Sequence, residues 1–106
     1  MNQDIAIGIT TLSSVDSARD MVKILLDENL IACGQIESGI ESHYEWNSNR
    51  VIDKEVRVTI KFKLTNAGDI EQIISKHHEY ETPQWVFWSV ESSDSYNEWV
   101  TKPKGK

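Results

Sequence analysis

Residues 56–64 read VRVTIKFKL, nine positions at which apolar and polar side chains alternate without interruption. Alternation with a period of two is typical of a β-strand that has one buried face and one solvated face. We therefore predict a strand over residues 56–64, with its apolar side chains in the core. It is the clearest element in the chain, and the neighbouring segments can be placed around it.

The segments before this strand predict a long hairpin. Residues 30–36 and 42–46 are strand-like, with a kink expected near Gly39, and residues 47–49, Asn-Ser-Asn, are typical of a turn. Strands commonly have about five or six residues, so a hairpin over residues 42–64 would extend beyond a domain this small. We expect its free edge to pair with a neighbouring subunit.

Strands and helices alternate along the rest of the chain. In chain order the predicted elements are a strand at 5–9, a helix ending at Asn29, the hairpin, a second helix after Asn66, a strand at 85–90 and a short helix from Ser93 or Asp94. This βαββαβ order is the split βαβ pattern of ferredoxin-like folds. We predict one α+β domain spanning residues 1–106, whose antiparallel sheet carries both long helices on one face.

Local signals predict where the two long helices begin and end. Ser13, followed three residues later by Asp16, resembles a capping box and predicts the start of the first helix. Asn29 suits the left-handed residue that ends a helix. Thr65 or Asn66 is expected to cap the second helix.

Composition argues against several kinds of partner. The 106 residues carry a net charge of −6, whereas a nucleic-acid partner needs clustered Lys and Arg. The one basic cluster, residues 102–106, is expected to be a solvated end. No apolar run approaches the roughly eighteen residues of a membrane span, and the first residues lack the pattern of a signal peptide. Cys33 is the single cysteine, so we expect a cytoplasmic protein without intramolecular disulfides.

The candidate copper ligands are Cys33, His77 and His78, whereas the third histidine, His43 on the hairpin, is expected to be solvated. A packing role is the simpler explanation for each of them alone, because Cys33 lies in an apolar strand and His77 continues the apolar stripe of its helix. Consecutive helical residues point about 100° apart, so the two imidazoles could share one ion only where the helix unwinds.

No arrangement typical of an enzyme is found in the sequence. The five glycines are dispersed and form no phosphate-binding loop, and there is no Gly-x-Ser-x-Gly elbow. Cys33 and His78 could imitate a thiol–imidazole pair, but the sequence supplies neither an orienting group nor an oxyanion hole. We predict a protein without catalytic activity.

Residues 85–88 read Trp-Val-Phe-Trp and place large side chains on both faces of one strand. A sheet that is covered on one face can bury only one of these sets. Large aromatic rings are also typical of the cores of protein interfaces. We therefore expect the second face to be buried by assembly.

Five short motifs resemble those of one known family. They are Ala32-Cys33, Ser42-x-Tyr44-x-Trp46, Glu55 with Lys61, His78-Glu79-Tyr80-Glu81-Thr82-Pro83, and Tyr96-x-x-Trp99. In this order and at this spacing they resemble the CutA family of divalent-cation tolerance proteins, over about residues 5–100. Each motif is weak by itself, whereas the ordered set is specific.

The resemblance implies a homotrimer that binds divalent metal ions and takes part in the response to metal ions without catalysis. Some members use the neighbourhood of two consecutive histidines for copper. The resemblance therefore gives His77 and His78 as the main ligands of a weak copper site, with Cys33 as a further candidate. The expected partners are other copies of the chain and divalent cations.

Some residues depart from the family pattern. Thr10 stands where some relatives have a second cysteine, Glu79 replaces the first proline of a His-Pro-Tyr motif, and Gln84 replaces a frequent glutamate. The alternative function is that of a PII-like signalling trimer, which binds a nucleotide between subunits. A phosphate site needs backbone amides and basic side chains, and few basic residues are expected at the clefts, so this alternative ranks second.

Overall fold

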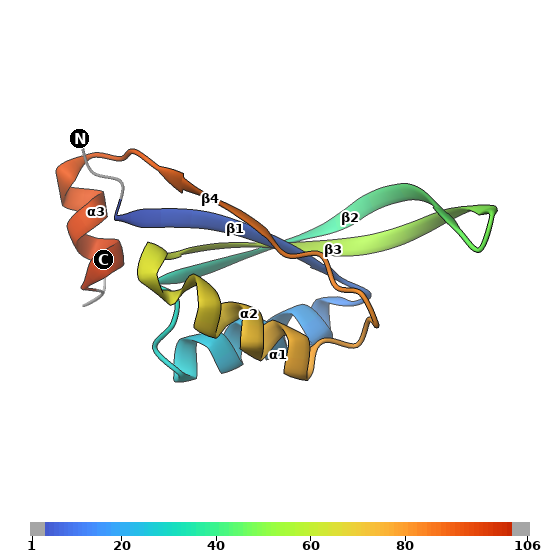
Figure 1. The fold of residues 1–106 in the computed structure, drawn as a ribbon, viewed down its shortest axis with the longest axis horizontal. Helices are drawn as coiled ribbons and strands as arrows, with labels where there is room; N and C mark the ends of the chain where they lie inside the picture. The colour runs from blue at the N-terminus through green and yellow to red at the C-terminus, as the bar shows by residue number, and fades with distance from the viewer. Residues whose placement is uncertain (1–3, 103–106) are drawn as a thin grey trace.

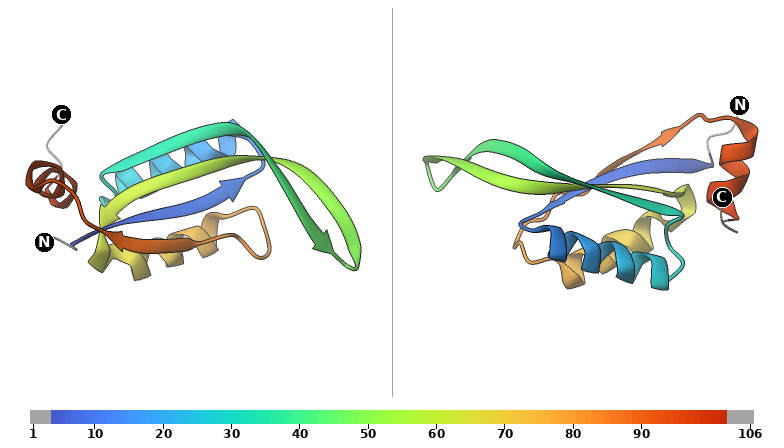
Figure 2. Two further views of the ribbon diagram at one scale, coloured as in Figure 1. Left: turned by 90° about the horizontal axis from the view of Figure 1, so that it is seen from above. Right: turned by 180° about the vertical axis from the view of Figure 1, so that it is seen from behind.

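The computed structural model of the protein describes residues 4–102 and has an α+β architecture (Figure 1). Two helices cover one face of a four-stranded sheet, and a third lies at its end (Figure 2). The elements are β1 (Ile5–Leu12), α1 (Val15–Asp27), β2 (Cys33–Trp46), β3 (Asn49–Lys63), a 3-10 turn (Leu64–Asn66), α2 (Ala67–His77), β4 (Val86–Val90) and α3 (Asp94–Thr101). The predicted ferredoxin-like fold is confirmed. The basic tail lies, apart from Lys102, outside the described residues.

The alternating stretch forms a strand with one buried face, as predicted, and the structure places it inside the sheet, between β2 and β1. The strand order is β2-β3-β1-β4, and all neighbouring pairs are antiparallel. In β3, Val58, Ile60 and Phe62 are buried in the core beneath the helices, whereas Arg57 and Lys61 remain partly exposed on the other face. Burial of such an apolar side chain contributes about 1.5–3 kcal/mol, so this strand anchors the fold.

The hairpin is longer and more continuous than the sequence indicated. It contains 14 residues in β2 and 15 in β3, and it projects from the body of the molecule (Figures 1 and 2). Asn47 and Ser48 have φ of 51° and 66°, which fits a two-residue turn of type I′. The expected kink is a register shift between Glu37 and Ile40, beside Gly39, whose φ of 82° suits glycine. The strand continues through this bulge.

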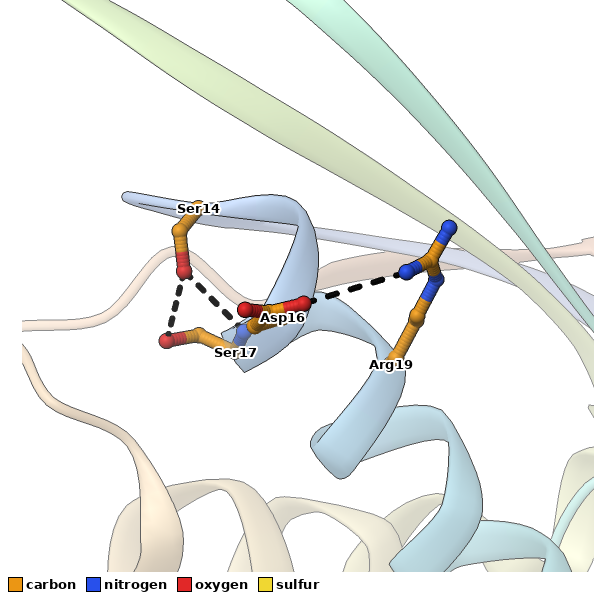
Figure 3. Close-up of polar contacts among 4 residues, drawn as sticks. All are labelled: Ser14, Asp16, Ser17 and Arg19. Atoms are coloured by element: carbon orange, nitrogen blue, oxygen red, sulfur yellow. Dashed lines mark hydrogen bonds and ion pairs between the residues drawn. The ribbon is translucent and has the colours of Figure 1, made fainter.

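The start of α1 differs from the predicted capping box. Ser14, not Ser13, is the N-cap, and its Oγ accepts a hydrogen bond of 3.0 Å from the Ser17 amide (Figure 3). Asp16 turns outward to Arg19, 3.8 Å away. The prediction was wrong by one residue because β1 continues to Leu12 and shifts the turn.

The other predicted helix limits fare differently. Asn29 has φ of 58°, which confirms the left-handed residue after α1. Asn66 occupies the N-cap position of α2, but its side chain donates to the carbonyl of Leu30 at 3.1 Å instead of capping the helix. The side chain of Asn66 therefore links the start of α2 to the segment that follows α1.

Large apolar side chains remain exposed on two parts of the sheet. They are Ile36, Tyr44, Trp46 and Ile52 on the hairpin and Val86, Phe87 and Trp88 on β4. The strands β2 and β4 are the outer strands of the sheet, and each has one edge without a strand partner among residues 4–102. No helix of the described residues is long and apolar enough to cross a membrane.

Candidate functional site around His78

We call residues 78–85, which join α2 to β4, the strap. Helix α2 ends at His77, and His78 already has an extended backbone with φ of −75° and ψ of 141°. The strap passes the end of β1 before it enters β4 (Figure 1). The two histidines therefore lie on either side of a helix end, and helical geometry does not fix the angle between their rings.

Both ring nitrogens of His78 are engaged within the chain. The amide of Tyr80 donates to Nδ1 at 3.0 Å, so Nδ1 carries no proton. The proton is therefore on Nε2, which donates to the carbonyl oxygen of Thr11 at 2.8 Å and lies 3.3 Å from the hydroxyl of Thr10. These contacts define one neutral tautomer of His78 and attach the strap to the end of β1.

Glu79 attaches the strap to the start of α1. Its Oε1 accepts hydrogen bonds from the Ser13 amide and the Ser13 hydroxyl, both at 2.7 Å, and its Oε2 lies 3.5 Å from the hydroxyl of Ser17. The Ser13 amide is the main cause that lowers the pKa of Glu79 below its ordinary value. A carboxylate in this position also complements the dipole at the start of α1.

Tyr80 attaches the strap to the hairpin. Its hydroxyl donates to the carboxylate of Glu55 at 2.9 Å, and its ring packs against His78 with centroids 4.8 Å apart. Burial, followed by the Glu55 carboxylate, raises the pKa of Tyr80. Pairing of β1 with β3 ends at Val56, and Glu55 is the next residue of β3 toward the hairpin turn.

Glu79 lies between two surface cavities. The smaller cavity, of about 220 Å³, is lined by Leu12, Ser17, Asp20, Met21, Ile24, His77 and Glu79. The larger, of about 380 Å³, is lined by Tyr44, Trp46, Asp53, Glu79, Tyr80, Glu81 and Thr82. The hydroxyl of Tyr44 is hydrogen-bonded to Asp53 in the larger cavity. This cavity thus combines aromatic rings with three carboxylates and includes no Lys or Arg among its lining residues.

Cys33 lies on the other side of the sheet from the helices. A Cβ placed on the next residue, Gly34, would lie 2.7 Å from Val22 of α1, so Gly34 faces the helices. Because successive strand residues face opposite ways, Cys33 and its ladder partner Lys61 face away from them. Within one chain, the half-buried Cys33 and the two histidines therefore do not lie together in one site.

The candidate ligands within one chain, His77 and His78, form only part of a cation site. His77 is exposed at the rim of the smaller cavity and can offer an imidazole. His78 fits only after one of its hydrogen bonds is broken. Among residues 4–102, no group of three or more His, Cys, Asp and Glu side chains is arranged to hold a metal ion.

Sequence reasoning missed the contacts that shape this site. The bonds of Glu79 to Ser13 and of Tyr80 to Glu55 join residues 66 and 25 positions apart. The one available signal was that Glu79 departs from the proline of the motif it resembles. Nothing in the sequence indicates which distant group the carboxylate reaches.

The fold and the site together define a class of protein. It is a small α+β chain whose ferredoxin-like sheet turns apolar side chains outward on a projecting hairpin and an edge strand. The family model described as CutA1 divalent ion tolerance protein matches residues 6–103, so the chain belongs to the CutA1 family.

Individual relatives agree with this assignment. The chain is 28% identical over 98 residues to the divalent-cation tolerance protein CutA of Thermus thermophilus, a match that covers 92% of this chain and 95% of the relative. It is 29% identical over 91 residues to the chloroplastic protein CutA of Arabidopsis thaliana, covering 85% of this chain but only 50% of that longer relative.

Solved structures agree in fold over nearly the whole chain. The structure of CutA1 from Ehrlichia chaffeensis superposes with a TM-score of 0.89 at 27% identity and covers 94% of each chain. CutA1 from a psychrotrophic Shewanella gives a TM-score of 0.88 at 29% identity, again over 94% of each chain. The family predicted from the five motifs is confirmed.

Proposed function

We propose that the protein is a homotrimeric, non-enzymatic divalent-cation tolerance protein of the cytoplasm, which binds copper weakly through His77 and His78. Its membership of the CutA1 family supports a role in the response to divalent cations. The Thermus relative is named as a divalent-cation tolerance protein, and the Arabidopsis relative is named as a chloroplastic CutA.

The observation that carries the assembly is the exposed apolar surface on the outer strands. Trp46 and Ile52 on the hairpin are 54% and 59% exposed, and Trp88 on β4 is 48% exposed. The free edges of β2 and β4 offer unpaired backbone groups beside these side chains. A ring of three copies would pair and cover such edges in a closed symmetry.

Light scattering coupled to size exclusion tests the assembly. At micromolar concentration we expect a single species with the mass of three chains. A stable species with the mass of one chain, 12.2 kDa, would exclude the homotrimer.

The cation site is supported by the end of α2. His77 is exposed on the last helical residue, and the extended backbone of His78 frees the second ring from helical spacing. Imidazole suits copper, which binds most tightly of the divalent first-row metals to such ligands. Cys33 could join a site only from another subunit, because it faces away from the helices in its own chain.

Copper titration by calorimetry tests the ligands directly. We expect weak binding to the wild type, weaker binding to His77→Ala and His78→Ala, and none to the double variant. Binding should also weaken as the pH falls, because protons compete with copper for imidazole. Unchanged affinity in the double variant would remove both histidines from the site.

The nucleotide-binding alternative is less well supported. The larger cavity carries carboxylates from Asp53, Glu79 and Glu81, and these would repel a phosphate. Calorimetric titration with ATP separates the two functions. Tight binding of ATP would favour the signalling trimer.

A further inference from the structure

The hydrogen bonds of the strap determine whether a cation can reach the imidazole of His78. We propose that Glu79 is a latch that holds the His78 imidazole closed to cations, so that binding at His78 requires the strap to release. This inference rests on the proposed function, because it concerns access to the same site.

A cation needs the lone pair of a ring nitrogen, and neither nitrogen of His78 offers one in the structure. The lone pair of Nδ1 accepts the amide proton of Tyr80, and Nε2 carries the proton that it donates to Thr11. To free Nδ1, the Tyr80 amide must move away. To free Nε2, its proton must leave and the Thr11 carbonyl loses its donor.

The Glu79 side chain decides whether the Tyr80 amide can move. Glu79 lies between His78 and Tyr80 in the chain, and its carboxylate is held by the amide and the hydroxyl of Ser13 at 2.7 Å each. These donors belong to the turn before α1, which is anchored by the core. Without the carboxylate, residues 78–80 of the strap would keep the hydrogen bonds of His78 and the bond between Tyr80 and Glu55, and the far end of the strap would stay packed on the core through Trp85.

The latch predicts a direction for cation affinity. The apparent affinity of a site scales with the fraction of molecules in the competent state, so a variant that opens the strap more often binds more tightly. Removal of contacts equivalent to one ordinary hydrogen bond should raise the affinity about fivefold. Electrostatics acts the other way, because the loss of a nearby negative charge weakens cation binding.

A neighbouring carboxylate provides the matched control. Glu81 lies on the same strap, is exposed, and lines the larger cavity together with Glu79. Glu81→Ala removes the same charge two residues away without touching the bonds to Ser13. The latch therefore predicts opposite signs for Glu79→Ala and Glu81→Ala.

The experiment is copper titration of the 106-residue chain and its variants at neutral pH, with circular dichroism as a check of folding. We expect up to about fivefold tighter binding for Glu79→Ala and slightly weaker binding for Glu81→Ala. Glu79→Gln, which keeps the shape of the side chain, should fall between the wild type and Glu79→Ala. Weaker binding of copper by Glu79→Ala than by the wild type would make Glu79 an attractive charge or a ligand, and would overturn the latch.

A measurement without metal keeps the latch separate from the proposed function. Hydrogen exchange of the Tyr80 amide should be faster in Glu79→Ala than in the wild type and unchanged in Glu81→Ala, because the amide is protected by its bond to Nδ1 of His78. Unchanged exchange in Glu79→Ala would overturn the latch even if copper binds. Faster exchange, together with full copper binding by the variant that lacks both histidines, would show that Glu79 holds the strap but would reject the histidines as ligands, and with them the role of the strap in cation access.

Discussion

The two halves of β3 show how one strand can be stabilised in two ways. From Val56 to Phe62 the strand lies between β1 and β2, and its inward side chains are almost completely buried. From Asn49 to Glu55 it pairs only with β2, and Ile52 is 59% exposed. The first half is held by the core, whereas the second is an isolated two-stranded ribbon, which is marginally stable in water.

The contrast indicates that the outer half of the hairpin is built for a partner. Its sequence does not alternate as residues 56–64 do, and its apolar side chains, including Trp46 and Ile52, gain little burial within one chain. Substitutions in the two halves should therefore act on different properties. Those in the inner half should change folding, and those in the outer half should change association.

Truncation in the inner half should have the largest effect. Phe62 is fully buried and contacts the rings of Trp85 and Phe87. Phe62→Ala should lower the free energy of unfolding by about 3–5 kcal/mol, because it leaves a cavity in the core. Urea denaturation measures the loss, with Thr59→Ala on the other face of β3 as a control expected within about 0.5 kcal/mol. A loss for Phe62→Ala as small as that of the control would contradict the division of the strand.

A charge in the outer half should change assembly instead of folding. Ile52→Glu places a carboxylate in the exposed apolar surface of the hairpin, where burial of an unpaired charge at an interface is unfavourable. We expect light scattering to show a shift from three chains toward one, with an unchanged circular dichroism spectrum. Glu71→Lys, at an exposed position of α2, is the control and should keep the wild-type mass. An Ile52→Glu protein that remains fully assembled would place the interface elsewhere.

The elements that sequence analysis predicted are those set by short-range patterns. The alternation of residues 56–64, the turn at residues 47–49 and the left-handed Asn29 each depend on a few adjacent residues, and all are found in the structure. The errors were at boundaries. β1 extends to Leu12, and the cap of α1 moves from Ser13 to Ser14 as a result.

The candidate site was less predictable, because its contacts link distant segments. The sequence identified His78 as a candidate ligand but gave no sign that Thr11 and Tyr80 occupy its two nitrogens. It also presented Glu79 only as a departure from a motif. Such contacts depend on how the end of β1, the start of α1 and the strap are placed relative to one another. The periodicity of apolar residues does not predict that placement.

The corrected cap of α1 can be tested by a pair of neighbouring serines. The Oγ of Ser14 accepts the Ser17 amide, so Ser14→Ala should lower the free energy of unfolding by about 1 kcal/mol. The hydroxyl of Ser13 donates to Glu79, and the Ser13 amide keeps its own bond to Glu79 in Ser13→Ala, so this variant should lose less. Thermal or urea unfolding of both variants ranks them. The reverse order would restore Ser13 as the cap.

The smallest effect should come from protonation of Glu79. Its folded-state pKa lies below the ordinary value of 4.5, mainly because the Ser13 amide donates to the carboxylate, so the ionised form is favoured by folding. A carboxyl with a depressed pKa adds stability that is present above its unfolded pKa and is lost as the pH falls through its folded pKa. Because the group is largely exposed, solvent screening keeps this contribution well under about 1 kcal/mol.

Glu79→Gln removes the titrating group while it keeps the size of the side chain. The wild type should therefore be more stable than Glu79→Gln at pH 7, and the difference should shrink as the pH is lowered below about 4.5. Urea unfolding of both proteins at pH 7 and at pH 3 measures the change, and Glu81→Gln controls for the loss of one charge on the strap. A difference between wild type and Glu79→Gln that stays constant across this range would mean that the carboxylate charge does not hold the strap. The bonds of His78 and Tyr80 and the packing of Trp85 on the core would then hold the strap without a contribution from this charge.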